Sequence, residues 1–126
     1  HNGYSFQPQI TIGNNVSINY DCHIACINSI TIGSNVLLAS RVFITDHFHG
    51  SVDAVALQTP PNKRPLISKG PVVIEDNVWI GEGVSIMPNV TIGKNSIVGA
   101  NAVVTKSFPA NSVLAGIPAV CIKSMS

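Results

Sequence analysis

Aliphatic side chains recur at every sixth position through most of this 126-residue chain. In the second half the series runs without a break. In the first half it forms two groups of three, separated by two extra residues. A second, mostly small residue follows four places after each member of the later series. The main series makes twelve repeats: Ile12, Ile18, Ile24, Ile32, Leu38, Ile44, Ile74, Ile80, Ile86, Ile92, Val98 and Val104.

A period of six residues fits neither an α-helix, which repeats every 3.6 residues, nor a hairpin meander, whose turn signals recur every 8–12 residues. It fits a short strand followed by a corner. Three such units make one triangular turn of eighteen residues, and twelve make four turns stacked at a rise of roughly 4.8 Å. We therefore predict an all-β chain, a parallel β-helix whose inward aliphatic ladders form one continuous core. The periodicity itself leaves the handedness open.

The corners and the interruption of the repeat follow from the breaker residues. Gly and Asn in residues 32–35 and 92–95 suit corners, because both tolerate the left-handed backbone conformation. Residues 45–71 lack the six-residue phase, are rich in Pro and carry two of the four histidines, so we predict an extended loop of the kind that is usually functional or disordered. Residues 107–126 lose strict phase and are expected to form a C-terminal cap. Residues 1–126 are expected to form a single domain.

Composition narrows the possible functions. Hydrophobic residues make up 45% and charged residues 10% of the chain, and the net charge is +1. Because no basic run is longer than Lys63-Arg64, nucleic-acid binding is disfavoured. The three cysteines are odd in number and form no CxxC pair, which argues against a disulfide framework or structural zinc and fits a cytoplasmic protein. The sequence contains neither a long apolar run nor a signal peptide, and whether a segment precedes His1 is left open.

Four further motifs follow one another in the second half of the chain: Asn-Val-Trp-Ile-Gly at 77–81, Val-Gly-Ala at 98–100, Val-Val-Thr-Lys at 103–106 and Ala-Gly-Ile-Pro-Ala at 115–119. As an ordered set, with a single loop, they resemble the maltose, galactoside and polysaccharide O-acetyltransferases of the hexapeptide-repeat family. The likeness extends from about Ile10 to Lys123, nearly the whole chain. Residues 44–50, Ile-Thr-Asp-His-Phe-His-Gly, look most similar to the branch that acetylates lipopolysaccharide O-antigen or capsule sugars.

This resemblance implies a fold, a reaction and an assembly. The fold is a left-handed parallel β-helix with one protruding loop, and the expected assembly is a homotrimer with each active site between neighbouring subunits. The reaction is transfer of an acetyl group from acetyl-CoA, as co-substrate, to a hydroxyl of a sugar in surface polysaccharide or lipopolysaccharide biosynthesis. No metal is required. The sequence identifies neither the acceptor nor the hydroxyl.

The family's general base is a histidine from the extended loop. A gapless match, five residues beyond Ile44, implies His49 rather than His47. The family's acceptor-binding asparagine, thirty residues earlier, corresponds to Asn19, and Asp46 and His47 are expected to contact the acceptor. Because a sugar hydroxyl is a poor nucleophile at neutral pH, a base must accept its proton as it attacks the thioester. The oxyanion formed needs a hydrogen-bond donor, which the sequence does not identify.

The resemblance places acetyl-CoA along the C-terminal coils. Small residues there are expected to let backbone amides approach the pantetheine arm, two lysines are expected to meet the phosphates, and a tryptophan is expected to form a wall of the cleft. In some relatives an arginine follows the Pro-Ala pair, whereas this chain has Val120, which puts nucleotide contacts there in doubt. The implied donor-site residues are Trp79, Gly81, Glu82, Gly99, Ala100, Thr105, Lys106 and Lys123.

Other interpretations of the same residues stay open. His49 is also consistent with an ordinary exposed loop histidine. Asp46, His47 and His49 are also consistent with metal ligation, as in a γ-type carbonic anhydrase, although no third histidine at suitable spacing supports this. Asn19 is also consistent with a ladder between coils. At the level of the whole chain, the alternatives are an antibiotic or amino-sugar acetyltransferase and a non-catalytic β-helix used for assembly or binding.

Overall fold

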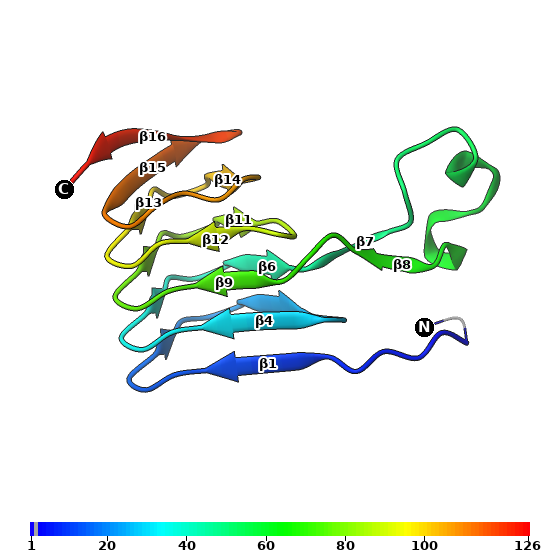
Figure 1. The fold of residues 1–126 in the computed structure, drawn as a ribbon, viewed down its shortest axis with the longest axis horizontal. Coiled ribbons are helices and arrows are strands. Elements are labelled where there is room, and N and C mark those ends of the chain that lie inside the picture. Colours follow the sequence, from blue (N-terminus) through cyan, green and yellow to red (C-terminus); the bar gives the residue numbers. More distant parts are fainter. Residues whose placement is uncertain (2) are drawn as a thin grey trace.

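The computed structural model describes residue 1 and residues 3–126, and it shows a three-sided column of stacked coils with one arm projecting from its side (Figure 1). Strands stack in parallel along each side of the column. This arrangement confirms the predicted parallel β-helix.

Sheet A contains β1 (Gln9–Ile12), β4 (Ser29–Ile32), β9 (Val72–Ile74) and β12 (Thr91–Ile92). Sheet C contains β3 (His23–Ala25), β6 (Phe43–Thr45), β11 (Ser85–Ile86) and β14 (Val103–Val104). Sheet B contains β2 (Ser17–Ile18), β5 (Leu37–Leu38), β10 (Trp79–Ile80), β13 (Ile97–Val98), β15 (Ser112–Gly116) and β16 (Ala119–Ser124).

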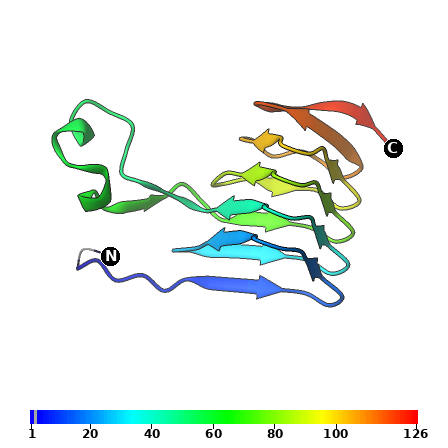
Figure 2. The ribbon, with the colours of Figure 1, turned by 180° about the vertical axis from the view of Figure 1, so that it is seen from behind.

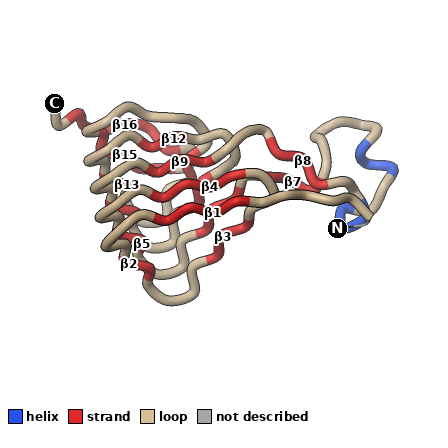
Figure 3. Tube along the Cα trace, turned by 60° about the horizontal axis from the view of Figure 1, so that its bottom comes forward, coloured by secondary structure: helices blue, strands red, loops and turns tan. Residues whose placement is uncertain are grey.

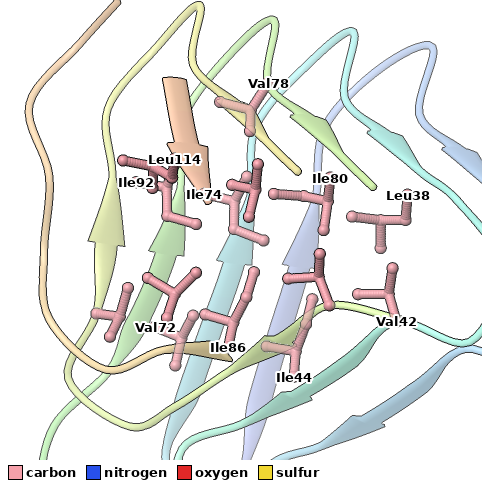
Figure 4. Close-up of a cluster of buried hydrophobic side chains, with 14 of the residues drawn as sticks. Leu38, Val42, Ile44, Val72, Ile74, Val78, Ile80, Ile86, Ile92 and Leu114 are labelled. Atoms are coloured by element: carbon pink, nitrogen blue, oxygen red, sulfur yellow. The ribbon is translucent and has the colours of Figure 1, made fainter. Parts of the chain in front are cut away.

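The strand registers bring all twelve predicted aliphatic positions into three ladders of four, which confirms the six-residue repeat. Sheet A aligns Ile12, Ile32, Ile74 and Ile92. Sheet B aligns Ile18, Leu38, Ile80 and Val98. Sheet C aligns Ile24, Ile44, Ile86 and Val104. The ladders face one another across the interior (Figure 4). In the second half of the chain, a buried residue four places after each ladder position fills the remaining space: Val78, Val84, Val90, Ser96, Ala102 and Phe108.

The core is fully buried in the middle of the column and open at its N-terminal end. Ile80 is fully buried, because Leu38 lies below it and Val98 above it. Ile12 and Ile18 point the same way in the first coil, yet each is 44% exposed, because the described chain has no coil beneath them. Burial in a stacked column therefore depends on having a neighbour on both sides.

Asparagines turn the chain at one corner of the column. Asn35 and Asn95, both in predicted corners, have positive φ angles of 58° and 64°. The equivalent asparagines at the neighbouring levels also have positive φ. The Asn95 amide donates to the side-chain oxygen of Asn111 (3.1 Å) and accepts from Asn77 (3.3 Å). Asparagine therefore serves twice, since it tolerates the left-handed backbone and also links one coil to the next.

The C-terminal segment adds a fifth level. Phe108 bridges to Ile92, and β15 pairs in parallel with β13, so that Leu114 lies over Val98. β16 then returns antiparallel to β15 and ends the sheet. The strict repeat does not reveal this level, because Phe108 follows Val104 by four residues rather than six. In the described part of the chain no helix is long and apolar enough to cross a membrane.

The arm leaves the column after β6 and returns at β9 (Figures 2 and 3). It contains β7 (His47–His49) and β8 (Leu66–Ser68), which pair antiparallel, and two 3₁₀-helical turns, η1 (Ala56–Gln58) and η2 (Pro61–Lys63). Beneath it the column continues without a gap, because β4 pairs directly with β9. The arm is thus an insertion between two adjacent coils, and the N-terminal residues run beside it (Figure 1).

Candidate active site

The arm carries both loop histidines on one short ribbon. In β7, His47 lies opposite Ser68 and His49 lies opposite Leu66. Because alternate residues of a strand share a face, the two imidazoles belong to one face of the ribbon and Phe48 belongs to the other. The β7–β8 pairing therefore holds two candidate proton-accepting groups side by side on a backbone that projects from the column.

Asp46, at the root of the arm, is a buried anchor. Its carboxylate is fully buried and accepts hydrogen bonds from the backbone N–H groups of Ile27 (3.0 Å), Asn28 (2.8 Å) and Ser29 (2.9 Å). The Cys26 thiol also donates to it, at 3.6 Å. This burial contradicts the predicted contact between Asp46 and the acceptor, because the carboxylate has no surface left to present.

The hydrogen bonds keep Asp46 ionised. Burial favours the neutral form of the carboxylate, but the backbone N–H groups of residues 27–29 and the His47 ring stabilise the charged form more, and the pKa of Asp46 falls below its ordinary 3.8. Asp46 in turn contributes, with burial, to raising the pKa of the Cys26 thiol, which therefore stays protonated. An ionised carboxylate can only accept hydrogen bonds, so every group around it must donate.

We expect Asp46 to stabilise the folded chain at neutral pH and to lose this effect in acid. Its pKa is lower in the folded state than the ordinary 3.8 of an unfolded chain. The contribution is therefore complete above that value and disappears as the pH falls through the depressed pKa. Urea unfolding of wild type and Asp46→Asn, from neutral pH into acid, measures this. The difference in free energy of unfolding should shrink toward low pH, and a difference that is independent of pH would contradict the assignment.

His47 is held firmly. Its Nδ1 lies 2.9 Å from an Asp46 carboxylate oxygen, and its side chain is only 13% exposed. The Thr45 hydroxyl accepts from the His47 N–H (3.3 Å) and donates to the His47 carbonyl (3.1 Å), which secures the backbone as well. Both the ring and the backbone of His47 are thus positioned by residues at the root of the arm.

His49 is exposed, as the proposed role of a base requires. Its ring meets that of His1 edge to face, at 5.4 Å between centroids. The next residue, Gly50, has φ of 89°, and a Cβ there would meet the Arg64 side chain at 2.9 Å. Gly50 therefore lets Arg64 pack across the chain directly after His49.

A hollow of about 240 Å³, which was not among the predicted site features, opens in the arm beside Gly50. Thr59, Arg64 and Ile67 contribute to its lining. The Arg64 Nε donates to the Thr59 carbonyl at 2.7 Å, which fixes the guanidinium in the hollow. The sequence signal for this feature is the basic pair Lys63-Arg64, of which Arg64 lines the hollow. A second hollow, of about 490 Å³, lies along sheet A and contains none of the predicted site residues.

Asn19 lies on the column rather than on the arm. Its side-chain amide donates to the Leu38 carbonyl of the next coil at 3.2 Å, and its backbone N–H donates to the same carbonyl at 3.0 Å. Among the described residues no hydrogen bond joins Asn19 to either arm histidine. One subunit therefore does not by itself bring the predicted acceptor ligand onto the predicted base.

The predicted donor-site residues follow the upper coils. The N–H groups of Gly81 and Gly99 donate at 2.8 Å to carbonyls of the next coil, and a Cβ on Gly81 would lie 2.7 Å from the Val98 carbonyl oxygen. Coil stacking thus requires the small size of Gly81, and neither N–H is available to a pantetheine arm. Ala100 and Thr105 are exposed.

The charged and aromatic members of the donor set are more accessible. Glu82 forms an exposed ion pair with Arg41 at 2.9 Å, so its carboxylate has a partner in the preceding coil. Lys106 lies 5.5 Å from the centre of the Phe108 ring, and Lys123 is exposed on β16. Trp79 is 51% exposed on the outer face of sheet B, between Leu37 and Ile97. In residues 1 and 3–126, no three His, Cys, Asp or Glu side chains gather at a point suited to a metal ion.

The comparisons with known proteins agree with this architecture. A model of the bacterial transferase hexapeptide family, six repeats long, matches residues 71–106. The chain is 46% identical over 117 residues to WbbJ of Escherichia coli K12, whose name assigns it to O-acetyl transfer in lipopolysaccharide biosynthesis; the match covers 90% of this chain and 60% of WbbJ.

Solved structures show the same coils. A maltose O-acetyltransferase from Clostridium difficile 630 is 43% identical, with a TM-score of 0.83, over 93% of this chain and 59% of its own. A hexapeptide-repeat acetyltransferase from Vibrio cholerae O1 biovar eltor, in complex with acetyl coenzyme A, is 36% identical, with a TM-score of 0.84, over 93% of this chain and 61% of its own. The chain thus spans about 60% of the length of these relatives. In its repeat, in its single arm and over the lengths of these matches, the chain is similar to the bacterial hexapeptide-repeat transferases.

Proposed function

We propose that the chain is an acetyl-CoA-dependent O-acetyltransferase that acetylates a hydroxyl of a sugar in surface polysaccharide or lipopolysaccharide biosynthesis. The main support for this proposal is the 46% identity to WbbJ, over a length that includes both the column and the arm. The named acetyltransferases from Clostridium difficile and Vibrio cholerae, the latter in complex with acetyl coenzyme A, support the same donor and reaction. We place the reaction in the cytoplasm, in keeping with three free cysteines.

His49 is proposed as the general base. It would accept the proton of the acceptor hydroxyl while the oxygen attacks the thioester carbonyl of acetyl-CoA. The tetrahedral intermediate would then collapse, the acetyl ester would form, and the thiolate would leave and take up the proton as free CoA thiol. No Ser-His or Cys-His pairing is present in the described chain, so we favour direct transfer over an acyl-enzyme. His47 and Asn19 are proposed to bind the acceptor.

The donor is proposed to lie against the outer surface of the upper coils. The exposed Trp79 offers a flat apolar wall, and Lys106 and Lys123 offer positive charge for phosphates. Because the N–H groups of Gly81 and Gly99 are occupied within the column, the pantetheine arm would contact side chains here, with Ala100 and Thr105 as further candidates.

The working assembly is proposed to be a homotrimer. The arm projects from the column, and its apolar side chains Val52, Val55 and Leu57 are each more than 70% exposed. The outer face of sheet B exposes Leu37 beside Trp79. Two unpartnered apolar surfaces on one chain favour a head-to-tail contact, in which the arm of one subunit covers the column of the next. This arrangement would bring an arm histidine of one copy close to the donor surface of another.

A thiol-release assay with acetyl-CoA tests the activity. The full chain is incubated with neutral sugars, amino sugars and aminoglycoside antibiotics, and mass spectrometry identifies the acetylated atom. We expect thiol release with sugar acceptors and an acetyl ester as product. Exclusive formation of acetyl amides would favour the amino-sugar or antibiotic alternative. If none of the acceptor classes leads to thiol release, a binding or assembly role would be favoured.

A further inference from the structure

The two extra residues in the first half of the repeat have a structural role that the period alone does not explain. The ladder positions Ile24 and Ile32 are eight residues apart, whereas successive ladder positions within a coil are six apart. The added length lies in the corner before β4. There, three successive backbone N–H groups, from Ile27, Asn28 and Ser29, converge on one point. Successive N–H groups aimed at one point form an anion-binding nest.

The anion in this nest belongs to the chain itself. It is the fully buried Asp46 carboxylate, the first residue after β6, and the hydrogen bonds measure 2.8–3.0 Å. The corner is therefore shaped to receive a negative charge from the root of the arm. A neutral side chain at position 46 would leave at least one of these three N–H groups without a good acceptor, which is costly in a buried place.

The same carboxylate determines the proton distribution on His47. Asp46 Oδ1 lies 2.9 Å from His47 Nδ1, and an ionised carboxylate only accepts hydrogen bonds. The proton of the neutral imidazole must therefore sit on Nδ1. The lone pair is then on Nε2, at the opposite edge of the ring. His49 has no carboxylate contact of this kind, and its ring touches only that of His1 among the described aromatic contacts.

We infer that Asp46 is a positioning residue, held by the backbone nest of residues 27–29, which fixes His47 as the Nδ1–H tautomer and so presents Nε2 as a hydrogen-bond acceptor for a hydroxyl of the acceptor. The first half of this inference, the tautomer, is independent of any reaction. The second half rests on the proposed function. The two extra residues of the first coil therefore have a structural role, because they form part of the corner whose N–H groups hold the carboxylate.

Nitrogen-15 NMR of histidine-labelled chain tests the tautomer directly. Two-bond proton–nitrogen correlations, recorded where the imidazoles are neutral, should show His47 with a protonated Nδ1 and an unprotonated Nε2. In Asp46→Asn, the side-chain oxygen should accept hydrogen bonds from the nest, so that the side-chain NH2 group faces His47. Nδ1 of His47 should then act as an acceptor, and the imidazole proton should move to Nε2. His23, exposed on β3, is the control and should not change. A wild-type His47 that is protonated on Nε2 overturns the inference, whether or not the variant folds.

A double-mutant cycle tests the link to the acceptor. Asp46→Asn should lower kcat/KM for the acceptor by about 10- to 100-fold, as expected for one charge-assisted hydrogen bond, with little change in KM for acetyl-CoA. In a His47→Ala background the same substitution should have almost no further effect. An equal loss in both backgrounds would mean that Asp46 acts only through the fold. If no acceptor is acetylated at all, the proposed function fails, while the NMR result still decides the tautomer.

Discussion

Replacing His49 with Ala is expected to lower kcat/KM for acetyl transfer by about 10²- to 10⁴-fold, the usual contribution of a general base. The hydroxyl would keep its proton as it attacks, so the transition state would develop an uncompensated positive charge on the acceptor oxygen. His49 is exposed on the arm and its imidazole makes no hydrogen bond in the described chain. Its removal should therefore leave the stability of the column almost unchanged. Thiol release and thermal unfolding measure the two quantities.

A matched control separates loss of the base from damage to the arm. Lys63 is exposed in the same arm, on η2, and Lys63→Ala should keep wild-type activity. His49→Ala should still bind CoA, because the proposed donor surface lies on the upper coils. If His49→Ala kept full activity while His47→Ala lost it, the base would be His47. The gapless match to the family would then have assigned the role to the wrong histidine.

Replacing Ile80 with Ala is expected to cost about 2–5 kcal/mol of the free energy of unfolding, the range found for buried aliphatic truncations. Ile80 is fully buried between Leu38 and Val98 in the ladder of sheet B, and the coils on either side cannot collapse into the space without breaking their strand pairing. Denaturant unfolding at one fixed protein concentration measures the loss, since any assembly makes stability depend on concentration.

Ile12 supplies the comparison for this prediction. It has the same side chain and the same ladder position, but it is 44% exposed and pairs with only one coil, through Ile32. Ile12→Ala should therefore cost clearly less than Ile80→Ala. Equal losses at the two positions would show that burial between two coils is not the source of stability. The stacking argument for the whole column would then fail.

The repeat could be read from the sequence because its physics is local. Each inward side chain is specified by a strand of a few residues, and one corner of each coil by an asparagine that tolerates positive φ, as at Asn35 and Asn95. Loss of phase after Val104 concealed the fifth level, in which Leu114 nevertheless lies over Val98. Leu114 follows Phe108 by the usual six residues, but Phe108 follows Val104 by only four.

The candidate site was less accessible to the same reasoning. The family resemblance implied an acceptor contact for Asp46, whereas its carboxylate is buried in the nest of residues 27–29. It assigned Gly81 and Gly99 to pantetheine by their size, whereas their N–H groups pair with the next coil. In both cases the deciding partner lies 15 or more residues away, and no local pattern names it.

By itself the sequence determined the three-sided column, because an aliphatic residue in every sixth place can be buried together with its neighbours only if the chain turns in threes and the turns stack. It also determined where an arm interrupts that column. Only the tertiary structure decided what each polar side chain does. A hydrogen bond depends on the position and direction of a partner from another coil, and a period carries no information about either.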